Sequence, residues 1–316
     1  MKKTLVAIAA VVATTGAMAE ATITGLFDLA VNSGSSTTLL GAGPNGGSEV
    51  TVGISEDLGN GIKGTAALTV IGAVTSMANS NVTSGFAMYN SYVGIELADV
   101  GSVKLGSQWN PIFLTGTIGE ITGRWNSASL ANTAELQNTN SVTYTSPTIS
   151  GFTFSYQTQL TNSAATTSSS STTYNAQNFN STGGHATAYS LQYTNGGLTA
   201  GYANSKDDNW KFAGDTTTST VIAASYDFGI AKLHYAHLVT DEATSGTDVT
   251  ANSYGVSVPF GAFVLGAQAS KNDASTVATT NSYIANYSMS KHTTVYYSNN
   301  NANSVVTNQL GIKMAF

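Results

Sequence analysis

The charged side chains that could act together are few, and most of them lie in segments of alternating polarity. Lysine and arginine number 11, aspartate and glutamate 17, and Arg124 is the only arginine. In an extended segment every second residue shares a face. The ionisable residues that fall on the faces opposite the apolar side chains are Asp28, Glu49, Glu96, Lys104, Lys232, His234 and Lys313. Fixed charges gathered on one side of a sheet bias which ions approach it.

The spacing of the remaining reactive side chains does not favour catalysis or metal binding. The absence of cysteine excludes disulfides, thiolate metal sites and cysteine nucleophiles. His234 and His237 lie on opposite faces of a strand and make a poor metal pair. Neither a GxSxG nor an HExxH motif occurs. The acidic excess argues against nucleic-acid binding, which requires clustered lysine and arginine. We therefore expect no catalytic residues, no metal, no cofactor and no nucleic-acid partner.

The first 19 residues have the pattern of an export signal. Two lysines precede a short apolar run, and Ala17-Met18-Ala19 has the small-x-small form of a signal peptidase site. The apolar run is shorter than the roughly 20 residues that a transmembrane helix requires. We expect a cleaved signal peptide at residues 1–19 and a single mature domain at residues 20–316, beginning at Glu20.

Alternating apolar and polar residues fill most of the mature chain. The last segment is the clearest example, with apolar side chains at positions 310, 312, 314 and 316 on one face and Thr307, Gln309, Gly311, Lys313 and Ala315 on the other. Charged residues are only 9% of the chain, compared with about 25% in soluble domains. The polar faces carry mostly small uncharged side chains, whereas a soluble sandwich usually exposes many lysines and glutamates. Tyrosine and phenylalanine recur near segment ends, as in the aromatic girdles of membrane barrels.

Counting these segments predicts the architecture. Sixteen strands are expected, at 21–31, 48–57, 62–71, 86–98, 102–109, 138–147, 150–160, 184–194, 198–205, 216–228, 231–240, 250–259, 262–271, 279–290, 292–299 and 304–316. Short connections rich in turn residues alternate with long polar ones, which places the short turns and both termini in the periplasm. The expected fold class is all-β, a 16-stranded antiparallel transmembrane barrel.

Several motifs resemble a known family. Val93-Gly94-Ile95-Glu96-Leu97 and Gly101-Ser102-Val103-Lys104-Leu105-Gly106-Ser107-Gln108 look like the fourth and fifth strands of the general porins of beta-proteobacteria. Asn140-Ser141-Val142-Thr143-Tyr144-Thr145-Ser146-Pro147, closed by Gly151-Phe152, is similar to the sixth strand, turn and seventh strand. The resemblance implies an outer-membrane homotrimer of a Gram-negative bacterium. It also implies a third loop folded into the barrel and a terminal aromatic, Phe316, that helps the assembly machinery recognise the chain.

The function expected from these observations is a water-filled channel for passive diffusion of small hydrophilic solutes and ions. Its partners would be outer-membrane lipid and lipopolysaccharide. The third loop, residues 110–137, would add three charged residues to the pore constriction: Glu120, Arg124 and Glu135. The two glutamates of this loop either bias ion entry as fixed charges or hydrogen-bond the loop to the barrel wall.

The chain departs from the family pattern in its charges. The family commonly has arginine where this chain has Ser107 and Thr143, so the resemblance does not carry anion preference over to it. Lumen and loop together hold five carboxylates and four permanent cations. The external loops add acids that are either solvated or share divalent cations with lipopolysaccharide: Asp207, Asp208, Asp215, Asp241, Glu242, Asp248 and Asp273. We expect a weak cation preference or neutrality.

Three alternatives remain open. A substrate-selective channel is the strongest, because Tyr92, Trp109, Phe113 and Trp125 lie near the expected pore lining. An outer-membrane barrel enzyme would need a serine that can be assigned to His234, and a structural or adhesive β-protein would conduct no ions. Conductance in a planar bilayer separates the channel from the last two.

Overall fold

The computed structural model describes residues 19–34, 38–43, 48–71, 87–122, 137–160, 185–208, 216–242, 248–273, 279–302 and 305–316. Strands dominate the described chain, as the alternating sequence predicts. They are β1 (Glu20–Ser33), β2 (Thr38–Ala42), β3 (Glu49–Gly59), β4 (Ile62–Ile71), β5 (Ala87–Leu97), β6 (Gly101–Trp109), β7 (Gln137–Thr145), β8 (Phe152–Gln159), β9 (His185–Asn195), β10 (Leu198–Asp208), β11 (Thr216–Asp227), β12 (Lys232–Glu242), β13 (Val249–Phe260), β14 (Phe263–Asn272), β15 (Thr279–Ser288), β16 (Thr293–Ala302) and β17 (Val305–Ala315).

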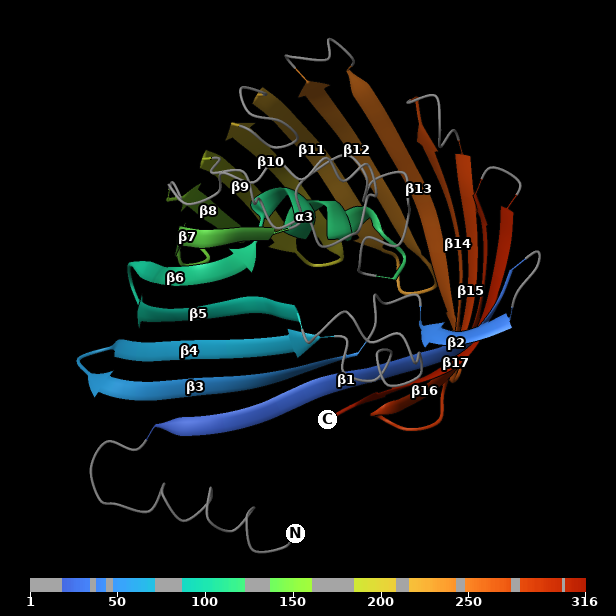
Figure 1. The fold of residues 1–316 in the computed structure, drawn as a ribbon, viewed down its shortest axis with the longest axis horizontal. Helices are drawn as coiled ribbons and strands as arrows, with labels where there is room; N and C mark the ends of the chain where they lie inside the picture. Colours follow the sequence, from blue (N-terminus) through green and yellow to red (C-terminus); the bar gives the residue numbers. More distant parts are fainter. Residues whose placement is uncertain are drawn as a thin grey trace, which may run out of the picture.

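These strands close into an antiparallel barrel. From β3 to β17 each strand pairs with the next, β1 pairs with β3, and β17 returns to pair with β1. The 16-stranded closed barrel expected from the sequence is confirmed (Figure 1). Closure leaves no free sheet edge, which is what a sheet in hydrocarbon requires.

The additional strand β2 lies within the connection that the sequence predicted as a loop. The N-terminal part of β1, from Glu20 to Leu26, pairs with β3, whereas its C-terminal part, from Leu29 to Ser33, pairs with β2. β2 and β3 therefore pair with the same edge of β1, one after the other, and together occupy one strand position in the barrel. β2 pairs with the backbone N–H and C=O groups of β1 that β3 does not reach. Leaving these groups unpaired at a strand edge would be costly.

The connection between β7 and β8 differs in detail from the expected tight turn at Ser146-Pro147. Ile149 and Phe152 exchange backbone hydrogen bonds of 2.8 and 2.9 Å. Between them Ser150 and Gly151 have φ values of 51° and 88°. Positive φ at both central residues is the geometry of a type I′ hairpin turn, whose twist suits antiparallel strands. The central residues of the turn therefore lie three and four positions after Pro147, where glycine permits a positive φ.

The outer face of the barrel is apolar but not uniform. On β3–β6 its exposed large residues are aliphatic: Val52, Ile54, Leu68, Val93, Ile95, Val103 and Leu105. On β8–β15 aromatic residues predominate: Phe152, Phe154, Tyr156, Tyr189, Tyr202, Tyr226, Tyr254, Phe263, Tyr283 and Tyr287. Within the described ranges, no helix has the length and apolarity needed to cross a membrane.

The third long connection begins with the short helix α3 (Pro111–Gly116) and the 3₁₀ turn η1 (Thr117–Gly119). The Asn110 side chain caps α3 by accepting a 2.9 Å hydrogen bond from the backbone N–H of Ile112, and Pro111 occupies the first turn. The helix lies against the inward-facing side of β9–β12 (Figure 1). Within the described residues, the barrel interior therefore has a part covered by α3 and a part that no described segment covers.

Candidate functional site

The covered part of the inner wall is built from small and apolar side chains. Ile112 of α3 belongs to a fully buried cluster whose wall members are Ala203, Val221, Ala223, Ala236, Leu238 and Ala251. Alternation places these wall residues inward on β10–β13, and their small size lets the helix approach the wall. A Cβ at Gly119 would lie 2.5 Å from the Ala236 Cβ, so this contact requires glycine.

Polar contacts fix the third connection to the same wall. The Asn110 side chain donates a 3.2 Å hydrogen bond to the Ser205 hydroxyl of β10. Nδ1 of His234 on β12 lies 3.3 Å from the Ile118 carbonyl. Both wall residues come from inward-facing positions, so the polar anchors and the apolar cluster act on the same segment of chain.

The strongest anchor joins Glu120 to β14. Gln268 accepts a 2.9 Å hydrogen bond from the backbone N–H of Ile121 and donates a 2.6 Å hydrogen bond to Oε2 of Glu120. Glu120 is 2% exposed. A charged acceptor strengthens such a bond. Glu120 thus has the geometry of a loop anchor, the second of the two roles that the sequence allowed.

The open part of the interior is a hollow of about 360 Å³ between α3 and the wall formed by β6–β9. Its described lining is Asn90, Lys104, Gln108, Trp109, Pro111, Leu114, Thr143, Thr145, Thr153, Ser155, Ser190 and Gln192. Lys104 is the only charged residue among them. Its Nζ lies 4.4 Å from the centroid of the Tyr92 ring, a cation–π contact that favours one position of the ammonium group.

The other acids and lysines expected in the lumen have different surroundings. Asp28 is fully buried, accepts a hydrogen bond from the Tyr296 hydroxyl, and accepts at its backbone carbonyl from the Ser48 hydroxyl. It lies opposite Lys313 in the register of β1 and β17. Burial separates this carboxylate from the open lumen, although the side chain points inward as alternation predicts.

The remaining charged residues expected in the lumen are Glu96, Lys232 and Glu49. The first two lie opposite a residue of opposite charge on the neighbouring strand. Glu96 on β5 is exposed and lies opposite Lys63 of β4 in the strand register. Lys232 on β12 is half-buried and lies opposite Asp227 of β11. Glu49, at the start of β3, is half-buried. Two residues expected in the constriction, Arg124 and Glu135, lie outside the described residues.

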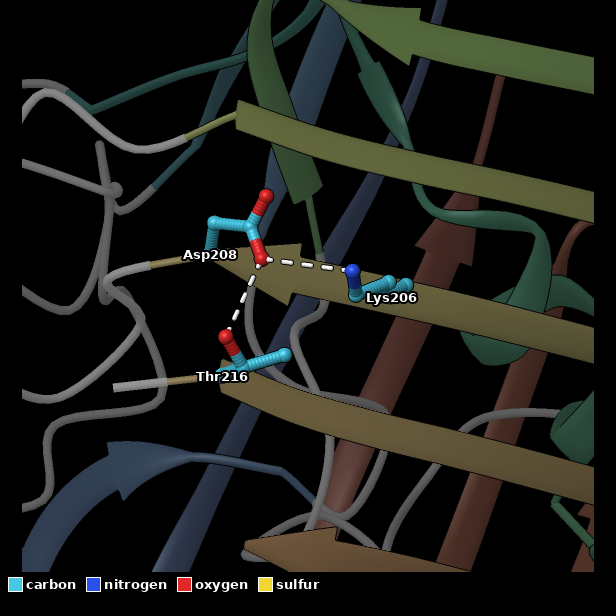
Figure 2. A network of polar contacts seen from close by, with 3 residues as sticks. All are labelled: Lys206, Asp208 and Thr216. Atoms are coloured by element: carbon cyan, nitrogen blue, oxygen red, sulfur yellow. Dashed lines mark hydrogen bonds and ion pairs between the residues drawn. The ribbon is translucent and has the colours of Figure 1, made fainter. Parts of the chain in front are cut away.

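The outer ends of β10 and β11 carry a polar network at the mouth of the barrel (Figure 2). The Lys206 Nζ lies 3.7 Å from Oδ1 of Asp208, and the Thr216 hydroxyl donates a 3.2 Å hydrogen bond to the same oxygen. The two charged side chains are 57% and 44% exposed, so the ion pair adds little stability. Its effect is to offset one of the acids at the mouth. Within the described chain no cluster of three or more potential ligands could hold a metal ion.

Comparison with known proteins identifies the family. A family model described as Gram-negative porin matches residues 6–304. The chain belongs to the Gram-negative porin family. It is an outer-membrane protein, and its family and fold are those of a channel. No curated protein sequence matches it.

Solved porin structures share the fold at low sequence identity. The anion-selective porin from Comamonas acidovorans is 20% identical, with a TM-score of 0.69 over 94% of this chain and 100% of that chain. Salmonella typhi OmpF, solved with daunomycin, is 13% identical, with a TM-score of 0.70 over 95% and 98%. The trimer form of OmpT, an outer-membrane protein of Vibrio cholerae, is 10% identical, with a TM-score of 0.67 over 94% and 99%.

Sequence reasoning missed the residues that hold the third connection of this porin in place. Alternation put Gln157 and Gln268 on polar inward faces but gave no partner for either. Gln157 donates a 3.2 Å hydrogen bond to the Trp109 carbonyl, and Gln268 contacts a residue 148 positions away. A long amide side chain on an otherwise small-residue inner face is the one signal that could have marked both as anchors.

Proposed function

We propose that this porin forms a water-filled channel for passive diffusion of small hydrophilic solutes and ions. The main support is the division of the barrel interior. The third connection packs on one side, and a hollow lined mainly by hydroxyl and amide groups remains on the other. A polar lining of uncharged groups hydrates a passage without strongly binding most solutes, which conduction requires.

Purified protein in a planar bilayer tests this proposal. We expect stepwise conductance increments that are ohmic in potassium chloride, and swelling of liposomes in small neutral solutes. Protein unfolded before addition is the control. Folded protein that inserts without conductance would contradict the proposal and favour a structural or adhesive protein.

We propose that this channel has a weak preference for cations or no ion preference. Glu49, Glu96, Lys104, Lys232 and Lys313 act as the fixed charges of the lumen, with carboxylates and lysines nearly balanced. Burial of Asp28 and Glu120 weakens the acidic contribution inside the barrel. The preference therefore arises mainly from the acidic outer mouth.

Reversal potentials across a potassium chloride gradient test the ion preference. Screening shortens the reach of the mouth charges from about 30 Å at 0.01 M salt to about 3 Å at 1 M. We expect a small cation preference at low salt that disappears at high salt. A clear anion preference at low salt would show that the lysines of the lumen dominate.

The assembly that we propose is a homotrimer of the beta-proteobacterial type, surrounded by outer-membrane lipid and lipopolysaccharide. The flatter wall around β1–β6 and β17 forms the contact between subunits. Its support is the outer face of β3–β6, which carries aliphatic residues, whereas β8–β15 carry mainly the aromatic ones that suit a lipid interface. Cross-linking and native mass in mild detergent should give trimers, and stable monomers would contradict this assembly.

Two further features concern export and assembly. We propose cleavage after Ala19, so N-terminal sequencing of the mature protein should start at Glu20.

Phe316 is proposed as an assembly signal. Its backbone exchanges hydrogen bonds of 2.9 and 3.0 Å with Gly25, and its ring packs against Phe27. Deleting Phe316 should impair outer-membrane assembly far more than Lys313→Gln, and equal assembly of both variants would contradict this role.

A further inference from the structure

The two sides of the hollow differ in chemistry. The wall formed by β7–β9 presents hydroxyl and amide groups, among them Thr145, Ser155 and Ser190. Thr145 and Ser155 are hydrogen-bonded at 3.2 Å, and Ser155 lies opposite Ser190 in the strand register. The opposite side is formed by the third connection. There Leu114 of α3, which is 44% exposed, supplies the apolar surface, and Pro111 is buried beside it.

Charge distinguishes this hollow from an ion-binding site. Its described lining contains no carboxylate, so none of these residues offers an anionic ligand to a hydrated cation. Its one cation, Lys104, lies over the Tyr92 ring. A solute that fits the remaining lining is uncharged, offers many hydrogen-bonding groups on one side, and has an apolar surface on the other.

Pyranose sugars have that two-sided chemistry. Their ring hydroxyls donate and accept hydrogen bonds, while the C–H groups of one ring face form an apolar surface. We propose that the hollow is a binding site for neutral pyranose sugars, an inference that rests on the proposed channel function and names its preferred solute class. The ring hydroxyls bond to Thr145, Ser155 and Ser190, and the C–H face packs on Leu114. A volume of about 360 Å³ is within the range of small-ligand sites.

The polar wall continues beyond this site along the barrel. A second hollow, lined by hydroxyl residues that include Thr51, Thr65 and Thr69, shares Asn90 with the first. It reaches Glu20 and Ser55, at the end of the barrel that carries the short turns. Successive weak sites of the same chemistry let a solute enter and leave, whereas one tight site would block the channel.

Single-channel recording with maltose tests the site directly. We expect maltose to reduce the open current saturably, with a measurable half-blocking concentration. Polyethylene glycol of the same hydrodynamic radius should reduce the current without saturation, because it lacks the pyranose ring face. Each current is normalised to the open current of the same variant. Maltose and polyethylene glycol acting alike would overturn the proposal.

Matched variants locate the binding site on the two sides of the hollow. The double variant Ser155→Ala and Ser190→Ala removes two hydroxyls and should raise the half-blocking concentration by about fivefold or more. Leu114→Asn, which keeps a similar side-chain size, should also raise it. The control is Ser282→Ala with Ser298→Ala, two buried inward hydroxyls on β15 and β16 that do not line the hollow.

The outcomes separate the sugar site from the channel function. An unchanged half-blocking concentration in the Ser155 and Ser190 double variant would overturn the sugar site while leaving the channel intact. A wild-type protein without ohmic conductance would overturn the proposed function, and the sugar site with it. Saturable maltose block that weakens in the hollow variants and persists in the control supports both.

Discussion

The two halves of the inner wall follow the same alternation of residues but do different things. On β10–β13 the inward positions that contact α3 include a buried cluster of alanine, valine and leucine: Ala203, Val221, Ala223, Ala236, Leu238 and Ala251. On β6–β9 the inward positions are mainly threonine, serine and glutamine, and they line the open hollow. Alternation determines which residues face inward. The size and polarity of those residues determine whether α3 packs on the wall or a hollow remains beside it.

The covered half explains how a short helix is stable inside the barrel. α3 has six residues, too few for an isolated helix to persist in water. Burial of Ile112 against the wall, together with the bonds from Asn110 and Gln268, stabilises it. On the side of α3 that faces the open half, Leu114 is 44% exposed, so truncating it removes less buried contact. Substitutions in the two halves should therefore have very different effects on the third connection.

The largest effect is expected from Ile112→Ala, which leaves a cavity in the buried cluster. It should destabilise the docked connection by about 2–5 kcal/mol, measured as faster hydrogen exchange of the amides of residues 112–121. Leu114→Ala on the exposed side of α3 is the matched control and should change exchange little. Equal exchange in the two variants would show that the covered half does not hold the helix.

Removing the anchor to β14 should have the next largest effect. Gln268→Leu leaves the Ile121 N–H without its acceptor and Glu120 without its donor from β14. Each buried group left without a bond costs about 1–3 kcal/mol. Exchange at residues 120–122 should rise and the open-channel current should become noisier. Gln192→Leu, on the open half, is the control, and the same noise in both variants would contradict the distinction.

Gly119→Ala tests the close approach of the connection to β12. The added methyl group would lie 2.5 Å from the Ala236 Cβ and from the Tyr235 carbonyl oxygen. Overpacking of this kind costs about 1–3 kcal/mol, so the connection should shift and the conductance change. Gly34→Ala, where no atom lies within 4 Å of the added group, should behave as wild type. A normal conductance in Gly119→Ala would show that the contact has room to relax.

The smallest effect on stability is expected on the open half. Lys104→Gln should change the stability of the third connection by less than about 0.5 kcal/mol. It should still move the reversal potential toward cation preference, because it removes the one charge among the residues described as lining the hollow. The shift should be larger at low salt. No shift in reversal potential would place the selectivity at the mouth rather than in the hollow.

Much of the fold could be predicted from the sequence because strand alternation and turn residues are local. Period two identified the sixteen long strands and the inward position of residues such as Lys104 and Asp28. It did not predict β2, because five residues carry too little pattern, and their pairing depends on the part of β1 that β3 leaves open. The shift of the turn to Ser150 and Gly151 likewise depends on the register of β7 and β8.

For the candidate site, too, part could be predicted from the sequence and part depended on the tertiary structure. By itself the sequence determined which side chains point into the barrel, since that depends only on the position of each residue along its own strand. Only the tertiary structure decided that Glu120 is an anchor held by Gln268, that Asp28 is covered, and that Leu114 faces a wall of hydroxyl groups. These roles arise from contacts between segments far apart in the chain, which form when the barrel closes and the third connection packs inside it.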